Sequence, residues 1–334
     1  MDYFNNVTCT AVLDYFGPSL DDHFDFTLTF EQSILSVLPS ALLLAVSPFR
    51  IAWLFRKATC ARSGWLLWTK LATVVIFLTL QVALVAQWGM PSTSRTRVSL
   101  AAAVLALVGS FTIAILVYAE HRRSVKPSTL LVAYLATSLL LDVAQARSLF
   151  LWHLSGYAVL AGLFVTALGT KFALLILEEV PKRSVLTGNL KTTGLESTSG
   201  PINRSVFWWI NELFAKGFRN VLKVGDLDAI DDSLASKRLL ARLGPAWKKS
   251  DKSAKHSLLV STWSSFQAAF LLPVLPRLCL AGFKFAQPFL VNRVISFVGE
   301  SNNTESRGIA GGLIGATALV YIGLAVSLDP RDRH

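Results

Sequence analysis

Charged residues are scarce in this chain of 334 residues: they make up 16% of it, against about 25% in an average soluble protein. Apolar residues make up 53%, and the mean hydropathy is +0.51. This balance excludes an ordinary soluble domain. The net charge of +11 would suit a nucleic-acid-binding protein, but the Lys and Arg residues flank apolar runs, as they do beside membranes. We therefore expect a membrane protein with no nucleic-acid partner.

Residues that could form a reactive centre are also lacking. The cysteines Cys9, Cys60 and Cys279 lie far apart, and none belongs to a C-x-x-C or Cys/His motif. Their spacing predicts neither a disulfide framework nor a metal site. The sequence shows no Ser/His/Asp constellation and no paired carboxylates for acid–base chemistry, so no catalytic residue is predicted.

The first 30 residues contain no Lys or Arg and carry five aspartates. A cleavable signal peptide needs a basic start followed directly by an apolar stretch, and this segment has neither. We interpret it as an acidic tail left outside the cell or in a lumen.

Seven apolar stretches are long enough to cross a hydrocarbon layer of about 30 Å, which takes about 20 helical residues. Each should be helical, because backbone polar groups cannot stay unpaired in lipid. The fold class is therefore an all-α polytopic membrane protein. The stretches are Ser33–Phe55, Trp65–Trp88, Val98–Ala119, Ser128–Phe150, Leu154–Leu177, Leu258–Val298 and Gly308–Leu328.

The placement of basic residues predicts the orientation. With the N-terminus outside, ten Lys and Arg residues fall on the inner side of the first five helices and three on the outer side. The positive-inside rule favours this topology and makes the long polar stretch after the fifth helix cytoplasmic. Sequons at Asn6 and Asn302 then lie outside and are candidate glycosylation sites, whereas Asn203 lies inside.

Three ionisable residues lie within the predicted spans. Lys70 and Lys171 sit one or two turns from the inner ends of their helices, where a lysine can extend its ammonium to the interface. Asp142 lies deeper, and we expect it to meet a polar neighbour inside the bundle in a structural role.

The polar stretch 179–256 opens with a Gly/Ser/Thr-rich segment, Thr187–Pro201, whose composition predicts a flexible linker. Ser205–Phe218 follows, rich in aromatic residues and too short to span. It suits a helix lying in the membrane interface, with Trp208 and Trp209 at headgroup level. The alternative is a buried helix of a small soluble domain, but no other soluble core is predicted nearby.

The next segment contains four closely spaced aspartates. A calcium-binding EF-hand loop beginning at Asp226 would need Gly at its sixth position and Glu at its twelfth, where this chain has Asp231 and Lys237. We reject that interpretation and expect Asp231 or Asp232 to cap a basic amphipathic helix. That helix would dock on the protein or on anionic lipid. Its apolar face would comprise Ala235, Leu239, Leu240, Leu243, Ala246 and Trp247.

The same connector carries a specific resemblance. The run Ser205–Phe218, followed by Leu222, Asp226-Leu227, Asp231, Leu234 and Trp247, resembles the lasso linker of the C subfamily of ABC transporters. That family includes multidrug-resistance-associated proteins, fungal vacuolar conjugate transporters and sulfonylurea receptors. The resemblance implies that the lasso and interface residues are Phe207, Trp208, Trp209, Phe214, Phe218 and Trp247.

The order of parts is also similar to that of the family. The resemblance implies an outer acidic tail at 1–32, a five-helix TMD0 bundle at 33–178 and a cytoplasmic lasso linker with interfacial amphipathic helices at 179–256. At 257–334 it implies the first two helices of a type-1 ABC transmembrane domain. Such a protein lies in the plasma membrane or the vacuolar membrane.

The ATP-hydrolysing motifs of that family are absent from these residues. A Walker A loop, G-x-x-x-x-G-K-[ST], occurs nowhere, and neither do the signature and Walker B motifs. We expect no enzymatic activity and no cofactor in this chain, although ATP and Mg serve the full-length family. The ending at Pro330–His334 suggests a truncated gene product, a fragment whose sixth and seventh helices lack partners and fold poorly.

The sixth apolar stretch is about forty residues long, roughly 60 Å as one helix. Pro273, Pro276 and Pro288 can kink it. In the multidrug-resistance-associated proteins a basic residue eleven positions before the third of these prolines contacts anionic conjugates, and the matching residue here is Arg277. Arg277 is therefore a candidate for binding amphipathic organic anions, with pairing to phosphate or a backbone carbonyl as the alternative.

Three functions are left open. The first is the N-terminal membrane portion of a C-subfamily transporter that exports or sequesters organic anions and conjugates, with the lipid bilayer and the rest of the transporter as partners. The second is a stand-alone TMD0–lasso module that anchors or regulates another membrane protein. The third is a seven-helix receptor, disfavoured because the Asp-Arg-Tyr and Asn-Pro-x-x-Tyr motifs are missing.

Overall fold

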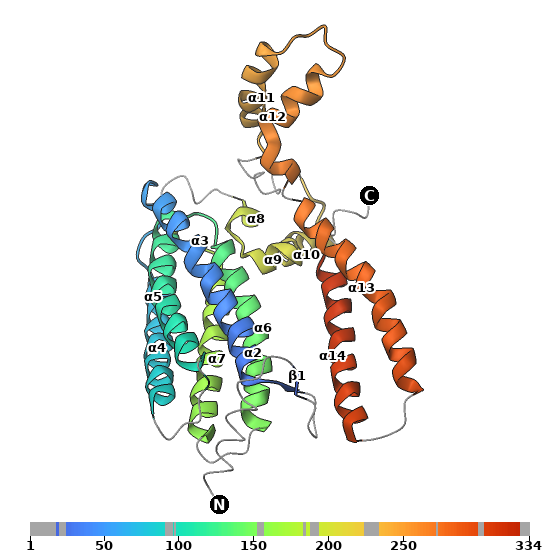
Figure 1. Ribbon diagram of the computed structural model, residues 1–334. Helices are drawn as coiled ribbons and strands as arrows, with labels where there is room; N and C mark the ends of the chain where they lie inside the picture. The colour runs from blue at the N-terminus through green and yellow to red at the C-terminus, as the bar shows by residue number, and fades with distance from the viewer. Residues whose placement is uncertain are drawn as a thin grey trace, which may run out of the picture. The chain divides into compact units, whose positions relative to one another are not determined.

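The computed structural model describes most of the chain as helix (Figure 1). Contacts divide the chain into two compact units: the first contains Phe26–Asp231, and the second contains Asp232–His334 together with Pro18–Asp25. The described residues are 18–19, 25–90, 96, 98–151, 157–182, 185–187, 194–223, 234–271, 273–299 and 304–327.

Five long helical stretches form the bundle of the first unit. The first is continuous through three elements, α2 (Leu28–Phe30), the π-helix η1 (Glu31–Val37) and α3 (Leu38–Phe55). The others are α4 (Trp65–Gly89), α5 (Ser99–Arg123), α6 (Thr129–Leu151) and α7 (Tyr157–Glu179). All five are long and apolar enough to cross a membrane. The predicted all-α class and the first five predicted spans are confirmed.

The helices alternate in direction, because short connections join consecutive ones. The last turns of α3, α5 and α7 therefore lie at the same end as the first turns of α4 and α6 (Figure 1). We call this the connector end, since the chain leaves α7 there. The pairs α4–α5, α4–α7, α6–α7 and α3–α5 make the main contacts.

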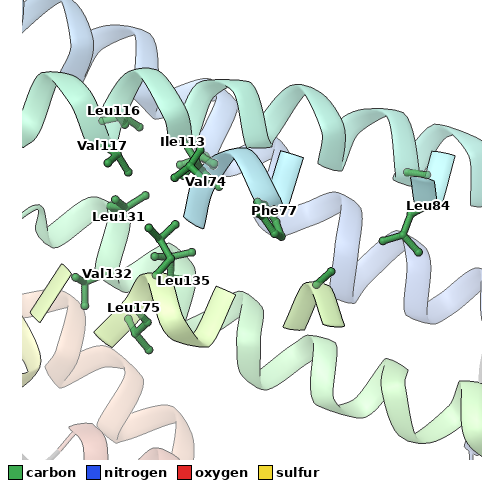
Figure 2. Close-up of a cluster of buried hydrophobic side chains, with 14 of the residues drawn as sticks. Val74, Phe77, Leu84, Ile113, Leu116, Val117, Leu131, Val132, Leu135 and Leu175 are labelled. Carbon is green, nitrogen blue, oxygen red and sulfur yellow. The ribbon is translucent and has the colours of Figure 1, made fainter. Parts of the chain in front are cut away.

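The core is mostly aliphatic and continuous through the bundle. Val74 and Phe77 of α4 lie near Ile113 of α5 and Leu135 of α6 in a cluster of buried side chains, and Leu84 lies further along α4 (Figure 2). Large apolar side chains also cover the outside, among them Phe49, at 79% exposed, and Leu140, at 70%. Apolar surface on both the inside and the outside is typical of helices that lie in lipid.

The π-helix η1 turns two polar residues inward at the end opposite the connector end. The side-chain oxygen of Glu31 accepts a hydrogen bond from Ser148 Oγ at 2.6 Å. The amide oxygen of Gln32 accepts bonds from Thr96 Oγ1 at 2.9 Å and Ser99 Oγ at 2.8 Å. A π-helix is rare, and here it brings buried polar residues of the first span to partners on α6, at the start of α5 and just before α5.

Short elements follow the bundle: α8 (Leu195–Thr198), α9 (Pro201–Ser205), the 3₁₀-helix η4 (Trp208–Ile210) and α10 (Asn211–Arg219). The predicted single helix over Ser205–Phe218 is wrong, because Phe207 has a positive φ of 56° and separates α9 from η4. A bulky residue in this left-handed region is strained. Two paired two-residue strands, β1 (Pro18–Ser19) and β2 (Asp25–Phe26), complete the described elements before α2.

The second unit contains α11 (Ser236–Lys249), α12 (Ser257–Leu271), α13 (Val274–Val298) and α14 (Thr304–Ser327). Helix α11 packs on α12, and α13 packs on α14 (Figure 1). The predicted continuous helix over Leu258–Val298 is wrong. It breaks before Pro273, which caps α13, because proline has no N–H to donate and clashes with the preceding turn.

Neither α13 nor α14 is among the candidate membrane spans found in the described residues. Helix α13 carries Arg277, Lys284 and Arg293, and the apolar part of α14 is limited to Ile309–Ala325. The sixth and seventh spans therefore stay predictions.

Candidate functional site: the connector end of the bundle

A buried network of charges closes the connector end of the bundle. We call it the connector-end network. Its centre is Glu120 of α5, which is 1% exposed and accepts bonds from Arg50 Nε at 2.7 Å and Ser128 Oγ at 3.1 Å. The backbone oxygen of Glu120 accepts a third bond, from Lys182 Nζ at 3.1 Å. Its members are Arg50, Lys70, Glu120, Ser128, Glu178 and Lys182.

Lys70 and Glu178 form the most deeply buried ion pair of this network. Lys70 Nζ lies 3.0 Å from Glu178 Oε2, and the two side chains are 0% and 1% exposed. The ammonium and the carboxylate form no hydrogen bond with each other, so the contact is an ion pair only. The prediction that Lys70 extends to the interface is wrong, because the opposite charge of Glu178 draws its ammonium inward.

A second ion pair lies nearer the middle of the bundle. Lys171 of α7 pairs with Asp142 of α6, and both residues are buried. Lys171 therefore does not extend to the interface either. The expectation that Asp142 meets a polar neighbour inside the bundle is confirmed. Burying two charges together costs far less than burying either one alone.

Lys182 lies just after α7 and is fully buried. Burial of its ammonium lowers its pKa from 10.5 to about 8; nearby Lys70 adds to the lowering, and the carboxylate of Glu178 opposes it. The folded protein therefore favours the neutral amine more strongly than the unfolded chain does.

We predict a pH dependence from this residue. Between about pH 8 and pH 10.5 the unfolded chain holds the Lys182 proton more tightly than the folded protein, so stability rises with pH in that window. The rise should reach up to about 3 kcal/mol. Lys182→Met should lack it. The measurement is thermal unfolding in nanodiscs across this range, and equal pH slopes for the two proteins would contradict the prediction.

The loops at this end are tied to each other by backbone bonds. The oxygen of Arg122 accepts the N–H groups of Cys60 at 2.8 Å and Ala61 at 3.3 Å. Segment 185–187, which follows α7, pairs with the same loop, since Ala61 and Leu186 form an antiparallel bridge. The α3–α4 loop is therefore held between the end of α5 and the exit of α7.

The connector is attached to the bundle through Glu179, the last residue of α7. Its two carboxylate oxygens accept the N–H groups of Ile202, at 3.2 Å, and Asn203, at 3.1 Å, in the first turn of α9. These N–H groups have no partner within the helix, so the carboxylate caps α9. We call this contact the Glu179 clasp.

Gly200 allows the clasp to form. A Cβ atom at this position would lie 2.0 Å from Glu179 Oε2 and 2.9 Å from its Cα. Thr198 and Ser199 beside it are buried. The flexible linker predicted over Thr187–Pro201 is therefore corrected for Gly194–Pro201, which is packed and hydrogen-bonded in this structure.

The aromatic residues of the connector are mostly exposed, unlike the buried charges of the connector-end network. Trp208 is 68% exposed, Phe214 65% and Phe218 94%, while Phe207 is exposed and Trp209 is half-buried. Exposed aromatic residues in one short segment are typical of a membrane or protein contact. The structure places these five predicted residues on η4, on α10 and at the residue before η4. Their predicted role at an interface stays a prediction.

The remaining predicted site residues lie in the second unit or outside the described residues. Trp247 is half-buried on α11, and Arg277 is exposed on α13. Helix α11 confirms the predicted basic helix, and its N-cap residue is Ala235. Asp231 and Asp232, the predicted capping residues, lie outside the described residues. Asn6 and Asn302, the predicted glycosylation sites, lie outside the described residues.

The connector end holds and positions segments of the chain. Among the described residues no group of three or more His, Cys, Asp or Glu side chains could hold a metal. The carboxylates instead pair with cations or cap a helix. Sequence reasoning missed Glu120, Glu178 and Glu179. They could have been found in the sequence as three acidic residues near the ends of helices whose neighbouring loops are basic.

Comparisons with known proteins agree on one family. Residues 8–159 match the family described as the ABC transporter TMD0 domain. The chain is 39% identical over 321 residues to ABC multidrug transporter lscH of Purpureocillium lilacinum, covering 94% of this chain and 21% of that protein. It is 40% identical over 307 residues to ABC multidrug transporter B of Aspergillus fumigatus, covering 91% of this chain and 21% of that protein. ABC transporter ecdL of Aspergillus rugulosus is 36% identical over 321 residues, with 95% and 20% covered. The chain thus spans about a fifth of the length of these relatives.

Proposed function

We propose that this chain, whose residues 8–159 match the TMD0 domain of ABC transporters and which is similar over most of its length to fungal ABC multidrug transporters, anchors a transporter's connector to the membrane. In this proposal the five-helix bundle is a fixed base. The connector begins from its charged end and leads to the helices of the transport domain. ATP hydrolysis is supplied by nucleotide-binding domains outside these 334 residues.

The Glu179 clasp carries the proposal. It joins the last residue of the bundle to the first turn of α9, within a segment whose neighbours Thr198 and Ser199 are buried. The connector-end network also supports the proposal, because Glu178, the residue before Glu179, pairs with Lys70 of α4. A connector fixed in this way leaves the bundle in a defined direction.

The finer assignment is to the C subfamily, with organic anions or conjugates as cargo. The lasso-like sequence of the connector supports it. So do the exposed aromatics of η4 and α10, which suit a contact with lipid headgroups or with the rest of the transporter. We propose that Arg277 of α13 contacts an anionic cargo when the transport domain is complete. The N-terminus then lies outside or in a lumen, and the connector is cytoplasmic.

Transport by the full-length protein that contains this chain tests the proposal. Inside-out vesicles should take up a glutathione conjugate in the presence of ATP. Arg277→Gln should raise the KM for the conjugate with little change in kcat if the arginine only binds it. Lys284→Gln, a basic residue of the same helix, is the matched control. Vesicles that take up neutral drugs but no anionic conjugate would contradict the cargo class.

A stand-alone module is the second candidate function. One observation favours it: the bundle forms a compact unit with its own core and its own buried ion pairs. A module of this kind would anchor or regulate another membrane protein through the connector. Mild solubilisation of native membranes distinguishes the two candidates, because a transporter would migrate as one long polypeptide and a module as a complex of this chain with a different protein.

A further inference from the structure

Two adjoining cavities lie inside the five-helix bundle, away from the connector end. One has a volume of about 60 Å³ and reaches Glu31, Gln32 and Gln145. The other, of about 40 Å³, reaches Tyr134, Asp142 and Lys171. Five residues line both: Ser36, Gln81, Leu84, Ala106 and Phe164. The cavities therefore share a wall, and Gln81 of α4 lies in it.

Two buried amide side chains line these cavities. Gln81 is 6% exposed and Gln145 is 5% exposed. Neither side chain forms a hydrogen bond with any other part of the chain that the structure describes. A buried amide left without a partner costs about 1–3 kcal/mol, and buried polar groups in folded proteins are almost always paired with protein or with ordered water. The cavities must therefore supply the partner.

The size of the cavities decides what that partner is. Sites for drug-sized ligands occupy about 300–1,000 Å³, far more than either cavity. A water molecule takes about 30 Å³ in the liquid and needs two to four polar partners. The polar lining offers those partners: two amides, the Ser36 hydroxyl and the charged groups of Asp142 and Lys171.

We propose that both cavities bind water and that they form one hydrated site inside the TMD0 bundle. Bound waters satisfy the amides of Gln81 and Gln145. They also reach the Asp142–Lys171 ion pair, where they reduce the cost of keeping two charges away from bulk solvent. Gln81 links the part of the site near Glu31 with the part near the ion pair. The site is independent of the cargo and of the transporter's activity.

Radiolytic hydroxyl labelling of the whole chain in lipid nanodiscs tests the proposal, because X-rays convert bound water into radicals that modify the side chains beside it. Leu84 lines both cavities, whereas Leu116 and Leu131 are fully buried in the core and line neither. We expect Leu84 to be labelled several-fold faster than these two leucines. Equal protection of all three leucines would overturn the proposal.

A substitution at Gln81 gives a second, independent readout. Gln81→Leu removes an amide whose partner is water, so it should lower the melting temperature by a few degrees and reduce the labelling of Leu84. Gln81→Asn keeps an amide in the cavity and should retain part of the labelling. If the cavities are dry, Gln81→Leu relieves an unpaired buried group and raises the melting temperature instead, which would overturn the proposal. The wild-type labelling ratio decides the matter if the variant does not fold.

Discussion

Lys70→Met should destabilise the five-helix bundle by about 3–5 kcal/mol. The substitution removes the cation that faces Glu178 at 3.0 Å and leaves a carboxylate that is 1% exposed without its partner. Both oxygens of Glu178 are shielded from solvent, so the carboxylate keeps its desolvation cost and loses the ion pair that offsets it. Unfolding in nanodiscs or mixed micelles, followed by temperature or denaturant, measures the loss.

Two controls separate this effect from a general loss of packing. Lys70→Met combined with Glu178→Leu replaces the pair with apolar groups and should recover most of the loss, because the desolvation of two charges disappears as well. Lys216→Met breaks an exposed pair with Glu212, at 2.9 Å and 59% and 61% exposed. It should change stability by less than about 0.5 kcal/mol. A double variant as unstable as the single one would contradict the account of the network.

Gly200→Val should release the connector from the bundle. Its side chain would meet Glu179 both at the carboxylate and at the backbone Cα, 2.9 Å away, so the clash cannot be relieved by moving a flexible end alone. Overpacking of this kind costs about 1–3 kcal/mol. The opening of α9 should become roughly 5- to 150-fold more frequent, and trypsin should cleave after Arg204 faster by a similar factor.

The matched control uses another glycine of the same unit. At Gly162 in α7 an added Cβ meets nothing within 4 Å. Gly162→Ala should leave cleavage after Arg204 unchanged. Glu179→Ala should accelerate it without any steric clash, because it removes the acceptor of the Ile202 and Asn203 N–H groups. If Gly200→Val and Gly162→Ala behave alike, the close approach at Gly200 has no role in holding the connector.

The sequence was most informative where structure depends on local composition. The five spans follow from apolar length alone, and α11 follows from the alternation of basic and apolar residues. The break at Pro273 lies at one of the prolines expected to kink the sixth stretch, although a full interruption was not predicted. Each of these features depends on residues that are close together in the sequence, so it can be recognised from one sequence alone.

Pairings between distant segments could not be predicted in the same way. Lys70 is buried because it pairs with Glu178 on another helix. The residues near Lys70 in the sequence give no indication of that partner. The same holds for Gly200, which looks like a linker residue until Glu179 is placed beside it. Phe207 has a positive φ without being glycine, so its sequence gives no sign of the break between α9 and η4.

The attachment of the connector to the bundle is the central claim, and hydrogen–deuterium exchange of the whole chain in lipid nanodiscs tests it most directly. The backbone N–H groups of Ile202 and Asn203 should exchange slowly in the wild type, because Glu179 accepts both. They should lose that protection in Glu179→Ala and Gly200→Val, while the amides of α4 and α5 stay protected. Exchange of these two amides in the wild type as fast as in an unstructured peptide would contradict the claim.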